Sequence, residues 1–442
     1  MTTPADATSA PADGTVVHAD VVVVGAGPGG SATAAWLAKA GRDVVLLEKS
    51  AFPRDKICGD GLTPRAVRQL IELEVPTEET DGWARNKGLR IIGGGMRLQL
   101  DWPEVDSFPS YGMVRGREDL DEFLARHAER CGATLVERRN VTEPVLDDSG
   151  RIVGVVAKVM GANGRATGER ITYRAPVVVA ADGVSSRLAV TMGREKREDR
   201  PMGVAVRAYY ETPRHTDDYM ESHLELWTKS AQDNSDILMP GYGWLFGVGD
   251  GRSNIGLGIL NTSEAFGKTD YKDVMRRWVE SMPQEWGISE ATITGPIKSA
   301  ALPMAFNRQP LYDKGLLLVG DAGGMVNPFN GEGIDYALEA AFVAAEVIDE
   351  ALRAQSTVAR DAVLQRYALR MKQMHGGYFR LGAEFAKLIG KPEIMRLATK
   401  YGLPRTTLMK FMLKLMANLP EERGGGFDDR IIHAMTRLAP SA

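Results

Sequence analysis

The chain has 442 residues, 44% of them apolar, and a net charge of −4, which are ordinary values for a globular protein of two or three domains. The charge balance argues against nucleic acid as a partner. Two cysteines, Cys58 and Cys131, are too few for a disulfide framework or a zinc site, so we expect no metal and a reducing compartment.

The first residues are rich in Ala, Pro, Thr and Asp and have neither a basic start nor an apolar stretch. We therefore interpret residues 1–18 as a disordered leader and not as a signal peptide. No apolar run reaches the ~18 residues that a membrane-spanning helix needs, so we expect no such helix.

Order is expected to begin near Ala19 with one βαβ unit. The apolar run 20–24 predicts a strand buried on both faces, a glycine loop follows, and residues 31–40 predict a helix. A second buried strand, 44–47, ends at Glu48. This order is typical of a dinucleotide-binding unit.

The loop between the first strand and the helix fits the pattern G-x-G-x-x-G. Gly25 allows the tight turn, Gly27 lets the backbone approach a pyrophosphate, and Gly30 lets helix and strand pack closely. Glu48, 23 residues after Gly25, is placed to accept hydrogen bonds from ribose hydroxyls. The alternative, a plain glycine turn and a surface glutamate, does not explain all four positions.

Two later segments have a different pattern. Residues 88–113 and 201–300 contain alternating and aromatic-rich runs, such as 97–100, 203–210, 223–227 and 254–258, which predict antiparallel sheet. Between these segments, 117–130 predicts an amphipathic helix and 177–181 a buried strand.

A second glycine-rich constellation indicates FAD as the cofactor. A buried strand, 316–319, leads into Gly320-Asp321, and the loop from Asn327 to Gly333 opens a long helix, 333–350. Asp321 is suited to bind a ribityl or ribose hydroxyl. The helix start at Gly331 to Ile334 would stabilise negative charge on the flavin edge.

We therefore predict an α/β (α+β) fold. A Rossmann-type FAD-binding domain (19–87, 114–200 and 301–355) is interrupted by an antiparallel β-sheet substrate domain (88–113 and 201–300), and a helical C-terminal region follows (356–442).

With Asp182-Gly183 and Arg117, these motifs resemble the p-hydroxybenzoate-hydroxylase-like flavoprotein superfamily and, within it, the geranylgeranyl reductase family. That family carries a Cys-Gly-acid-Gly segment, matched at Cys58–Gly61, and a lipid-pocket stretch P-x-x-Y-x-W-x-F-P, matched in part at Pro240–Gly247. Here the stretch is one residue shorter after the proline, and Gly247 replaces the final proline.

The segments 52–56, 58–65, 101–103 and 327–336 are most similar to an actinobacterial branch of this family. Members of that branch saturate one isoprene unit of the menaquinone side chain. The resemblance thus implies an FAD-dependent oxidoreductase acting on a polyprenyl lipid, with menaquinone as the expected substrate and geranylgeranyl diphosphate or another prenyl lipid as the alternative.

The motifs and the resemblance together give one set of cofactor-binding candidates. The resemblance adds the backbone of Val141 near the adenine and Arg117 near a phosphate or ribose. The full set is Gly25, Gly27, Pro28, Gly29, Gly30, Glu48, Lys49, Cys58, Gly59, Asp60, Arg117, Val141, Asp182, Asp321, Gly331, Gly333 and Ile334.

Reduction of an isolated alkene needs hydride from the reduced flavin and a proton from elsewhere. The candidate catalytic residues are Cys58, Tyr242 and Trp244, and Cys58, Tyr242 or an ordered water is the proton donor. The alternatives are a small buried cysteine and ordinary core aromatics. Glu332 either acts near the flavin or is an acid in the first turn of a helix.

Residues 401–420 form an apolar segment with basic residues and no acid after Arg405. The helical spacing of its apolar residues is typical of a membrane-surface helix or a lipid-channel wall. The alternative is a helix packed on the rest of the protein. With a lipid substrate, a membrane-surface helix indicates a cytoplasmic protein bound peripherally at the inner face of the cell membrane.

Two competing functions share these motifs. A flavin hydroxylase or halogenase has the same fold, although the W-x-W-x-I-P motif of halogenases is absent from the sequence. A non-catalytic lipid carrier would have no use for Glu48, Asp321 or Gly331–Gly333. A second nucleotide-binding fingerprint is also missing, so NAD(P)H and a ferredoxin-like protein both remain open as electron donors.

Overall fold

A computed structural model describes residues 14–229, 235–262 and 266–439. Most of the expected leader, 1–13, lies outside the described residues. Its last part does not follow the expectation, because Val16–His18 form strand β1 and pair in parallel with Thr172–Arg174.

A six-stranded sheet forms the centre of the cofactor domain, and its strands are parallel except for β21 at one edge. The runs of Val and Leu form its inner strands because both faces are covered. In spatial order the strands are β21 (Tyr312–Asp313), β22 (Leu316–Leu318), β13 (Val177–Ala180), β2 (Val21–Val24), β3 (Val44–Leu47) and β9 (Thr134–Val136).

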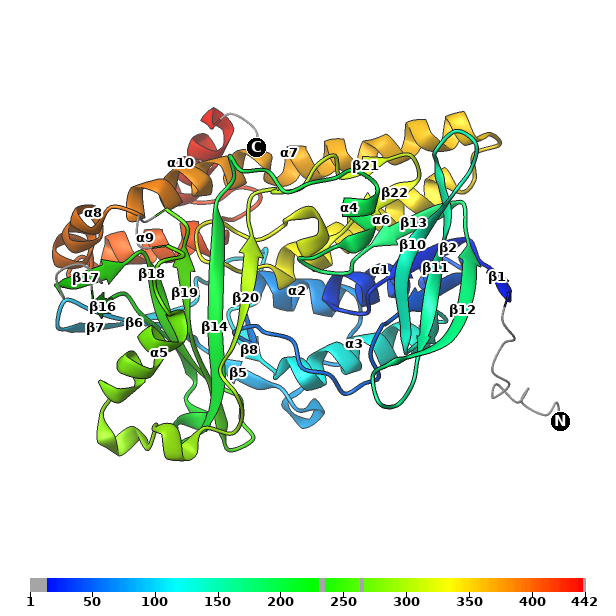
Figure 1. Cartoon of the computed structure of the whole chain (residues 1–442). Helices are drawn as coiled ribbons and strands as arrows, with labels where there is room; N and C mark the ends of the chain where they lie inside the picture. The colour runs from blue at the N-terminus through cyan, green and yellow to red at the C-terminus, as the bar shows by residue number, and fades with distance from the viewer. Residues whose placement is uncertain (1–13, 230–234, 263–265, 440–442) are drawn as a thin grey trace.

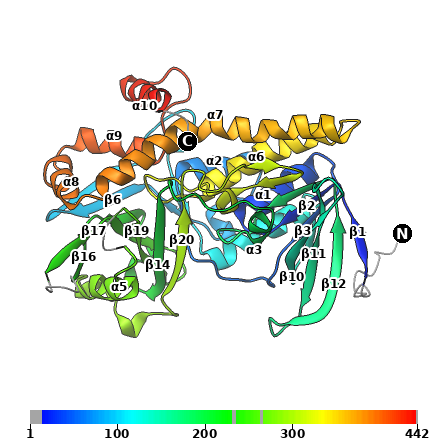
Figure 2. The same cartoon turned by 45° about the horizontal axis from the view of Figure 1, so that its top comes forward.

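This sheet lies between a layer of helices and a second sheet (Figures 1 and 2). The helices are α1 (Pro28–Lys39), α3 (Arg117–Arg130) and α6 (Ile334–Ala351). The second sheet has the order β1, β12 (Ala166–Arg174), β11 (Ile152–Met160), β10 (Arg139–Leu146). This arrangement places the ends of the parallel strands, where the glycine loops lie, next to the substrate domain and the C-terminal helices.

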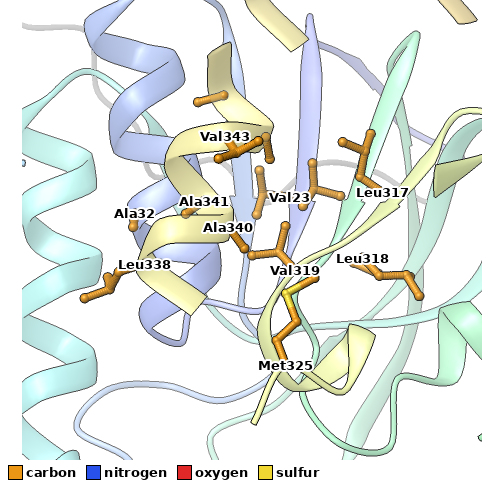
Figure 3. Packing of buried hydrophobic residues seen from close by; sticks show 14 of the residues in the cluster. Val23, Ala32, Leu317, Leu318, Val319, Met325, Leu338, Ala340, Ala341 and Val343 are labelled. Atoms are coloured by element: carbon orange, nitrogen blue, oxygen red, sulfur yellow. The ribbon is translucent and has the colours of Figure 1, made fainter. Parts of the chain in front are cut away.

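Small side chains let the helices approach the central sheet closely. Figure 3 shows Ala340 and Ala341 of α6 between Ala32 of α1 and Val23 of β2, and all four residues are buried. Small residues at this point allow close packing of α1 and α6, which begin at Pro28 and Ile334. Both helix starts belong to the glycine motifs of the sequence.

The substrate domain is built on a seven-stranded sheet. Its strands pair antiparallel except for β15 with β6. The order is β20 (Lys298–Pro303), β14 (Met202–Glu211), β19 (Arg252–Leu260), β18 (Gly241–Gly247), β15 (Tyr219–His223), β6 (Gly88–Gly93) and β7 (Met96–Asp101). Helix α5 (Tyr271–Glu280) packs on it with its buried face.

Smaller elements complete this part. A two-stranded sheet joins β16 (Leu226–Lys229) to β17 (Asp236–Met239), and a three-stranded sheet has the order β4 (Gly61–Leu62), β8 (Gly112–Val114), β5 (Ala84–Asn86). The short helices are α2 (Pro64–Glu72) and α4 (Arg187–Thr191), with 3₁₀ turns at Glu79–Asp81, Pro213–Thr216, Gln284–Trp286, Glu290–Thr292 and Gly320–Gly323.

The C-terminal region is helical. Helix α7 (Thr357–Ile389) has 33 residues and runs along the molecule from the cofactor domain to the seven-stranded sheet (Figure 1). The chain then turns back through α8 (Pro392–Leu397), a π-helical segment (Ala398–Gly402), α9 (Thr406–Met416) and α10 (Phe427–Leu438). No described helix is long and apolar enough to cross a bilayer.

The predicted fold class is confirmed, and two local predictions need correction. The run 223–227 is not one strand: His223 ends β15, and Leu226 begins β16 in another sheet. The strands β10 to β12 are missing from the sequence prediction, which assigned no strand between 139 and 174.

Candidate active site

One continuous cavity of about 900 Å³ runs from the glycine loop after β2 to the C-terminal helices. Its volume lies near the upper end of the range for small-molecule sites, about 300–1,000 Å³. Polar motifs of the cofactor domain line one end. Apolar side chains of the seven-stranded sheet and of helices α7 to α9 line the other.

The glycines at the polar end divide into two kinds. A Cβ on Gly30 would lie 1.8 Å from the carbonyl oxygen of Gly25, and a Cβ on Gly25, at φ +99°, would lie 2.4 Å from the carbonyl oxygen of Ala181. These two positions need glycine for packing. A Cβ on Gly27 meets no atom within 4 Å, and Gly27 borders the cavity at the start of α1.

Glu48 is held by a chain of alternating charges. Arg117 Nε donates to Asp121 Oδ1 (2.7 Å), Arg54 Nη1 donates to Asp121 Oδ2 (2.7 Å), and Arg54 Nη2 donates to Glu48 Oε2 (3.0 Å). The N–H groups of Ala26 and Ser50 also donate to Glu48. This network fixes the carboxylate at the cavity wall, where it can accept further hydrogen bonds.

The second glycine loop also lines this cavity. Asp321 follows β22, and a Cβ on Gly333 would lie 3.7 Å from Asp321 Oδ1. Gly331 has φ +77°, a backbone conformation that favours glycine. Gly333 caps α6, so the first N–H groups of that helix point toward the cavity wall.

These residues fit an FAD molecule. The open space at Gly27, next to the start of α1, suits a pyrophosphate, and Glu48 suits a ribose. Asp321 and the start of α6 suit the ribityl chain and the flavin edge. One buried carboxyl oxygen of Asp182, at the cavity wall, has no hydrogen-bond partner among the described residues, which also points to a polar ligand.

The loop Cys58–Gly61 is fixed to the substrate sheet by Asn254 of β19. Asn254 Nδ2 donates to the carbonyl oxygen of Cys58 (2.8 Å) and to Asp60 Oδ2 (2.7 Å), and Asn254 Oδ1 accepts from Trp244 Nε1 (2.8 Å). Asn254 is fully buried. One amide side chain thus joins the loop to the aromatic wall of the cavity.

The carboxylate of Asp60 accepts hydrogen bonds from three separate segments of the chain. Asp60 has φ +67° and accepts hydrogen bonds from the Tyr209 hydroxyl (2.6 Å), Asn254 and the backbone N–H of Arg117 (3.2 Å). Burial raises the pKa of its carboxyl to about 6, although the bonds from Tyr209 and Asn254 oppose that rise. Asp60 links three parts of the chain that all contribute to the cavity.

Three aromatic residues of β18 form one wall of the apolar end. Tyr242, Trp244 and Phe246 alternate with Gly243 and Leu245, so all three project to the same face of the strand. The Trp244 and Phe246 rings lie 6.4 Å apart at 27°. The Tyr242 hydroxyl donates to the carbonyl oxygen of Asn330 (2.5 Å), in the second glycine loop.

The opposite wall comes from the C-terminal helices. Leu388 of α7, Met395 of α8, and Met409 and Met412 of α9 line the cavity, and flexible methionines adapt well to apolar ligands. Part of the segment 401–420 therefore lines the cavity. Leu413 and Leu415 of the same helix are buried in the protein.

Glu332 lies where the two ends of the cavity meet. Its Oε1 accepts from the Thr63 hydroxyl (2.6 Å) and from the Thr63 N–H (3.3 Å), while Asn330 Nδ2 lies 3.4 Å from Oε2. Burial raises its pKa to about 7, and the bonds from Thr63 oppose this.

Most of the residues predicted from the sequence lie together. Gly30 and Asp60 are not among the described residues that line the cavity: Gly30 packs on Gly25, and Asp60 lies behind the Cys58 loop. The cavity wall includes Gly25, Gly27, Pro28, Gly29, Glu48, Lys49, Cys58, Gly59, Arg117, Val141, Asp182, Tyr242, Trp244, Asp321, Gly331, Gly333 and Ile334.

The sequence analysis did not select Arg54, Thr63 or Asn254. Arg54 and Thr63 lie close in sequence to the Cys58 motif, which was the available signal. Asn254 follows Arg252 and Ser253 at the polar start of β19, 196 residues from Cys58, and no local pattern in the sequence marks it.

Comparison with known proteins assigns the cofactor domain. Residues 18–375 match the family described as FAD binding domain. The chain belongs to the FAD binding domain family. This flavoprotein is 36% identical, over 94% of its length and 97% of the relative's, to the menaquinone reductase of Mycobacterium tuberculosis (strain CDC 1551 / Oshkosh).

The flavoprotein also has more distant relatives. It is 30% identical to digeranylgeranylglycerophospholipid reductase 1 of Methanopyrus kandleri, over 85% of its length and 91% of the relative's. The crystal structure of a geranylgeranyl bacteriochlorophyll reductase-like protein from Thermoplasma acidophilum has a TM-score of 0.69 at 23% identity and covers 96% and 97% of the two chains. The predicted family, the FAD cofactor and the oxidoreductase class are confirmed.

Proposed function

We propose that this flavoprotein reduces an isoprenoid double bond, in one isoprene unit of the menaquinone side chain. The observation that carries the proposal is the continuity of the cavity: the FAD-binding end opens directly into an apolar chamber. The menaquinone reductase that is 36% identical over 94% of the chain supports the same substrate.

An isoprenoid chain suits the apolar chamber. It offers no charge and few polar groups, and the chamber between β18 and helices α7 to α9 offers aromatic, Leu and Met side chains. Removal of apolar surface from water, at about 25 cal/mol per Å², would provide most of the binding free energy. The same walls exclude water from the reacting alkene.

Bound FAD, once reduced, supplies hydride to one alkene carbon. The residues of the chain orient the two partners. Tyr242 ties the aromatic wall to the loop at Asn330, and Asn254 ties Trp244 to the Cys58 loop. Alignment of an unactivated alkene depends on such fixed walls, because a small misplacement of reacting atoms slows the reaction strongly.

Peripheral membrane contact at the α8–α9 end would explain how the lipid enters. Leu397 and Tyr401 are 56% and 51% exposed there, and Leu388 and Leu408 are both exposed and part of the cavity wall. Arg396, Lys400, Arg405 and Lys410 are exposed nearby, and the sequence has no acid between Ile394 and Pro420. Apolar residues among cations suit an anionic lipid surface.

A sedimentation experiment tests this contact. The K400Q/R405Q variant should bind vesicles of anionic lipid less than the wild type does, and K372Q, an exposed lysine of α7, should bind like the wild type. Equal binding by all three proteins would reject contact through α8–α9. The cytoplasmic face of the membrane stays a prediction, as do NAD(P)H and a ferredoxin-like protein as electron donors.

A redox-silent lipid gives a clean test of alkene reduction. The FAD-loaded protein is reduced with dithionite under argon and mixed with geranylgeranyl diphosphate, which has no quinone ring to accept electrons. Return of the oxidised flavin spectrum with a product heavier by two hydrogens supports prenyl reduction. A flavin that stays reduced restricts the proposal to quinone-bearing lipids.

A further inference from the structure

Glu332 is a carboxylic acid at the junction of the FAD-binding end and the apolar chamber. It lines the cavity beside Gly331 and Gly333, and it is only partly buried. Glu332 precedes Gly333, the N-cap of α6, and so it is not an acid of the first turn of that helix. Its position therefore calls for a chemical explanation.

The hydrogen bonds of Glu332 leave one of its oxygens available for a proton. Oε1 accepts two hydrogen bonds from Thr63, at 2.6 and 3.3 Å. Oε2 has only the amide of Asn330, at a long 3.4 Å. A proton on Oε2 is thus compatible with every contact, and the Thr63 donors stabilise the carboxylate that remains after the proton has left.

Burial favours the neutral form of Glu332 and raises its pKa to about 7, whereas Thr63, Asn330 and Arg65 favour the carboxylate. Asp335, in the first turn of α6, is fully buried, and neither of its carboxyl oxygens has a hydrogen-bond partner among the described residues. Burial raises the pKa of Asp335 well above its ordinary value, and the charge of Glu332 raises it further. Two adjacent enclosed carboxyl groups resist joint ionisation.

The nearest cation is already committed elsewhere. Arg65 of α2 donates to Glu339 Oε2 (2.9 Å) and lies 4.0 Å from Asp335. Glu339 also faces His375 of α7 (3.2 Å). The Arg65 charge is therefore largely balanced by Glu339, and this network does not force Glu332 to ionise.

The other candidate donors are less suitable. Tyr242 of β18 already donates its hydroxyl proton to the Asn330 carbonyl. Burial raises the pKa of that hydroxyl above its ordinary value, and the nearby Glu332 adds to the rise. The Cys58 thiol interacts with Arg117, on the cofactor side of the site. Glu332 lines the cavity, keeps one carboxyl oxygen available for a proton and has a pKa suited to donation at neutral pH.

We propose that Glu332 donates the proton that completes reduction of the alkene, a role that rests on the proposed function above. The Oε2–H bond breaks as a C–H bond forms at one alkene carbon. Hydride from the two-electron-reduced flavin reaches the other carbon, so the double bond becomes a single bond with two added hydrogens. The Glu332 carboxylate takes up a new proton from water after the product leaves.

The test compares E332Q with wild type and with E346Q. The E332Q amide keeps the size of the side chain and an oxygen to accept from Thr63. Glu346 is an exposed glutamate of the same helix α6 and provides the matched control. Each FAD-loaded protein is reduced under argon, mixed with menaquinone, and assayed for saturated side chain in a single turnover across pH.

With Glu332 as donor, E332Q loses at least about 100-fold in the single-turnover rate. The wild-type rate falls as the pH rises through about 7, because the acid must be protonated, and E332Q lacks this pH dependence. E346Q matches the wild type, and FAD content is equal in all three proteins. A wild-type rate and pH profile in E332Q would overturn the proposal.

Infrared spectroscopy gives a readout that is independent of turnover. The pH-difference spectrum of the wild type should show a protonated carboxyl band that disappears near pH 7 and is missing from E332Q but present in E346Q. Persistence of the band in E332Q would overturn the assignment. If the wild type saturates no lipid, the proposed function fails, and the infrared titration still decides whether Glu332 holds the proton.

Discussion

The hydroxyl of Tyr242 donates a 2.5 Å hydrogen bond to the backbone carbonyl of Asn330. This single contact joins the aromatic wall of the substrate domain to the second glycine loop of the cofactor domain. The contact thereby fixes the position of the lipid chamber relative to the loop at the flavin edge.

Removal of that hydroxyl should loosen the junction. In Y242F, the Asn330 carbonyl loses its partner, and for this part-buried hydrogen bond the loss costs about 1 kcal/mol of unfolding free energy. Side-chain saturation should slow while FAD content stays constant. Urea unfolding measures the loss of unfolding free energy, and turnover assays measure the slower side-chain saturation. Y219F, which loses a hydroxyl bonded to Asp101 near the surface, is the control, and equal effects of the two variants would contradict the junction role.

Alanine substitutions at two glycines of one motif should have different effects. In G27A the methyl group projects into open space at the FAD-binding end, so the apoprotein should unfold at its normal temperature while FAD binds at least about 10-fold more weakly, a loss of about 1.4 kcal/mol. In G30A the methyl would lie 1.8 Å from the Gly25 carbonyl oxygen, so the fold itself should be destabilised by about 3 kcal/mol. Flavin fluorescence and apoprotein unfolding separate the two effects. Identical behaviour would contradict the assigned roles.

The raised pKa of Asp60 predicts that the free energy of unfolding depends on pH. Its folded pKa of about 6 lies above the ordinary 3.8, so the native state binds the proton more tightly than the unfolded state does. The stabilisation is full below pH 4 and is lost as the pH rises through 6, by about 3 kcal/mol in total.

The D60N variant isolates this contribution. Asparagine tolerates the left-handed backbone of residue 60 and carries no titrating group. Unfolding free energies from urea titrations between pH 4 and 7 should fall with pH more steeply in the wild type than in D60N. Parallel curves would show that Asp60 does not carry the raised pKa.

A larger side chain on α9 should obstruct the lipid and spare the cofactor. Met412 is partly buried and lines the apolar chamber. M412W should raise the KM for menaquinone about 10-fold or more, while dithionite still reduces the bound FAD fully. M374W, at an exposed methionine of α7, should leave the KM unchanged. An unaltered KM in M412W would place the lipid elsewhere.

Local patterns in the sequence were enough to predict the cofactor end. The turn at Gly25, the close packing at Gly30 and the acid at Glu48 depend on residues within one βαβ unit, so their spacing predicts their geometry. The apolar spacing of residues 401–420 indicated a helix that faces lipid or protein. The structure shows that it lines the chamber and also packs in the core.

Contacts between distant segments could not be predicted in this way. Asn254 binds the Cys58 loop across 196 residues, and no periodicity signals such a pairing. For Glu332, the sequence allowed both a role near the flavin and a first-turn acid. The structure places Glu332 one residue before Gly333, the N-cap of α6, and therefore outside the first turn, and it bonds Glu332 to Thr63, 269 residues away. Its role near the flavin is our proposal.

The most direct test of the central claim is the mass of the menaquinone recovered from the reduced, FAD-loaded protein under argon. The extract is exposed to air before analysis, so that any quinol ring returns to the quinone and only hydrogens on the side chain remain. Prenyl reduction predicts a gain of two hydrogens that survives this oxidation. A menaquinone that returns to its starting mass, although the flavin has been oxidised, would contradict it and show that the quinone ring alone had accepted the electrons.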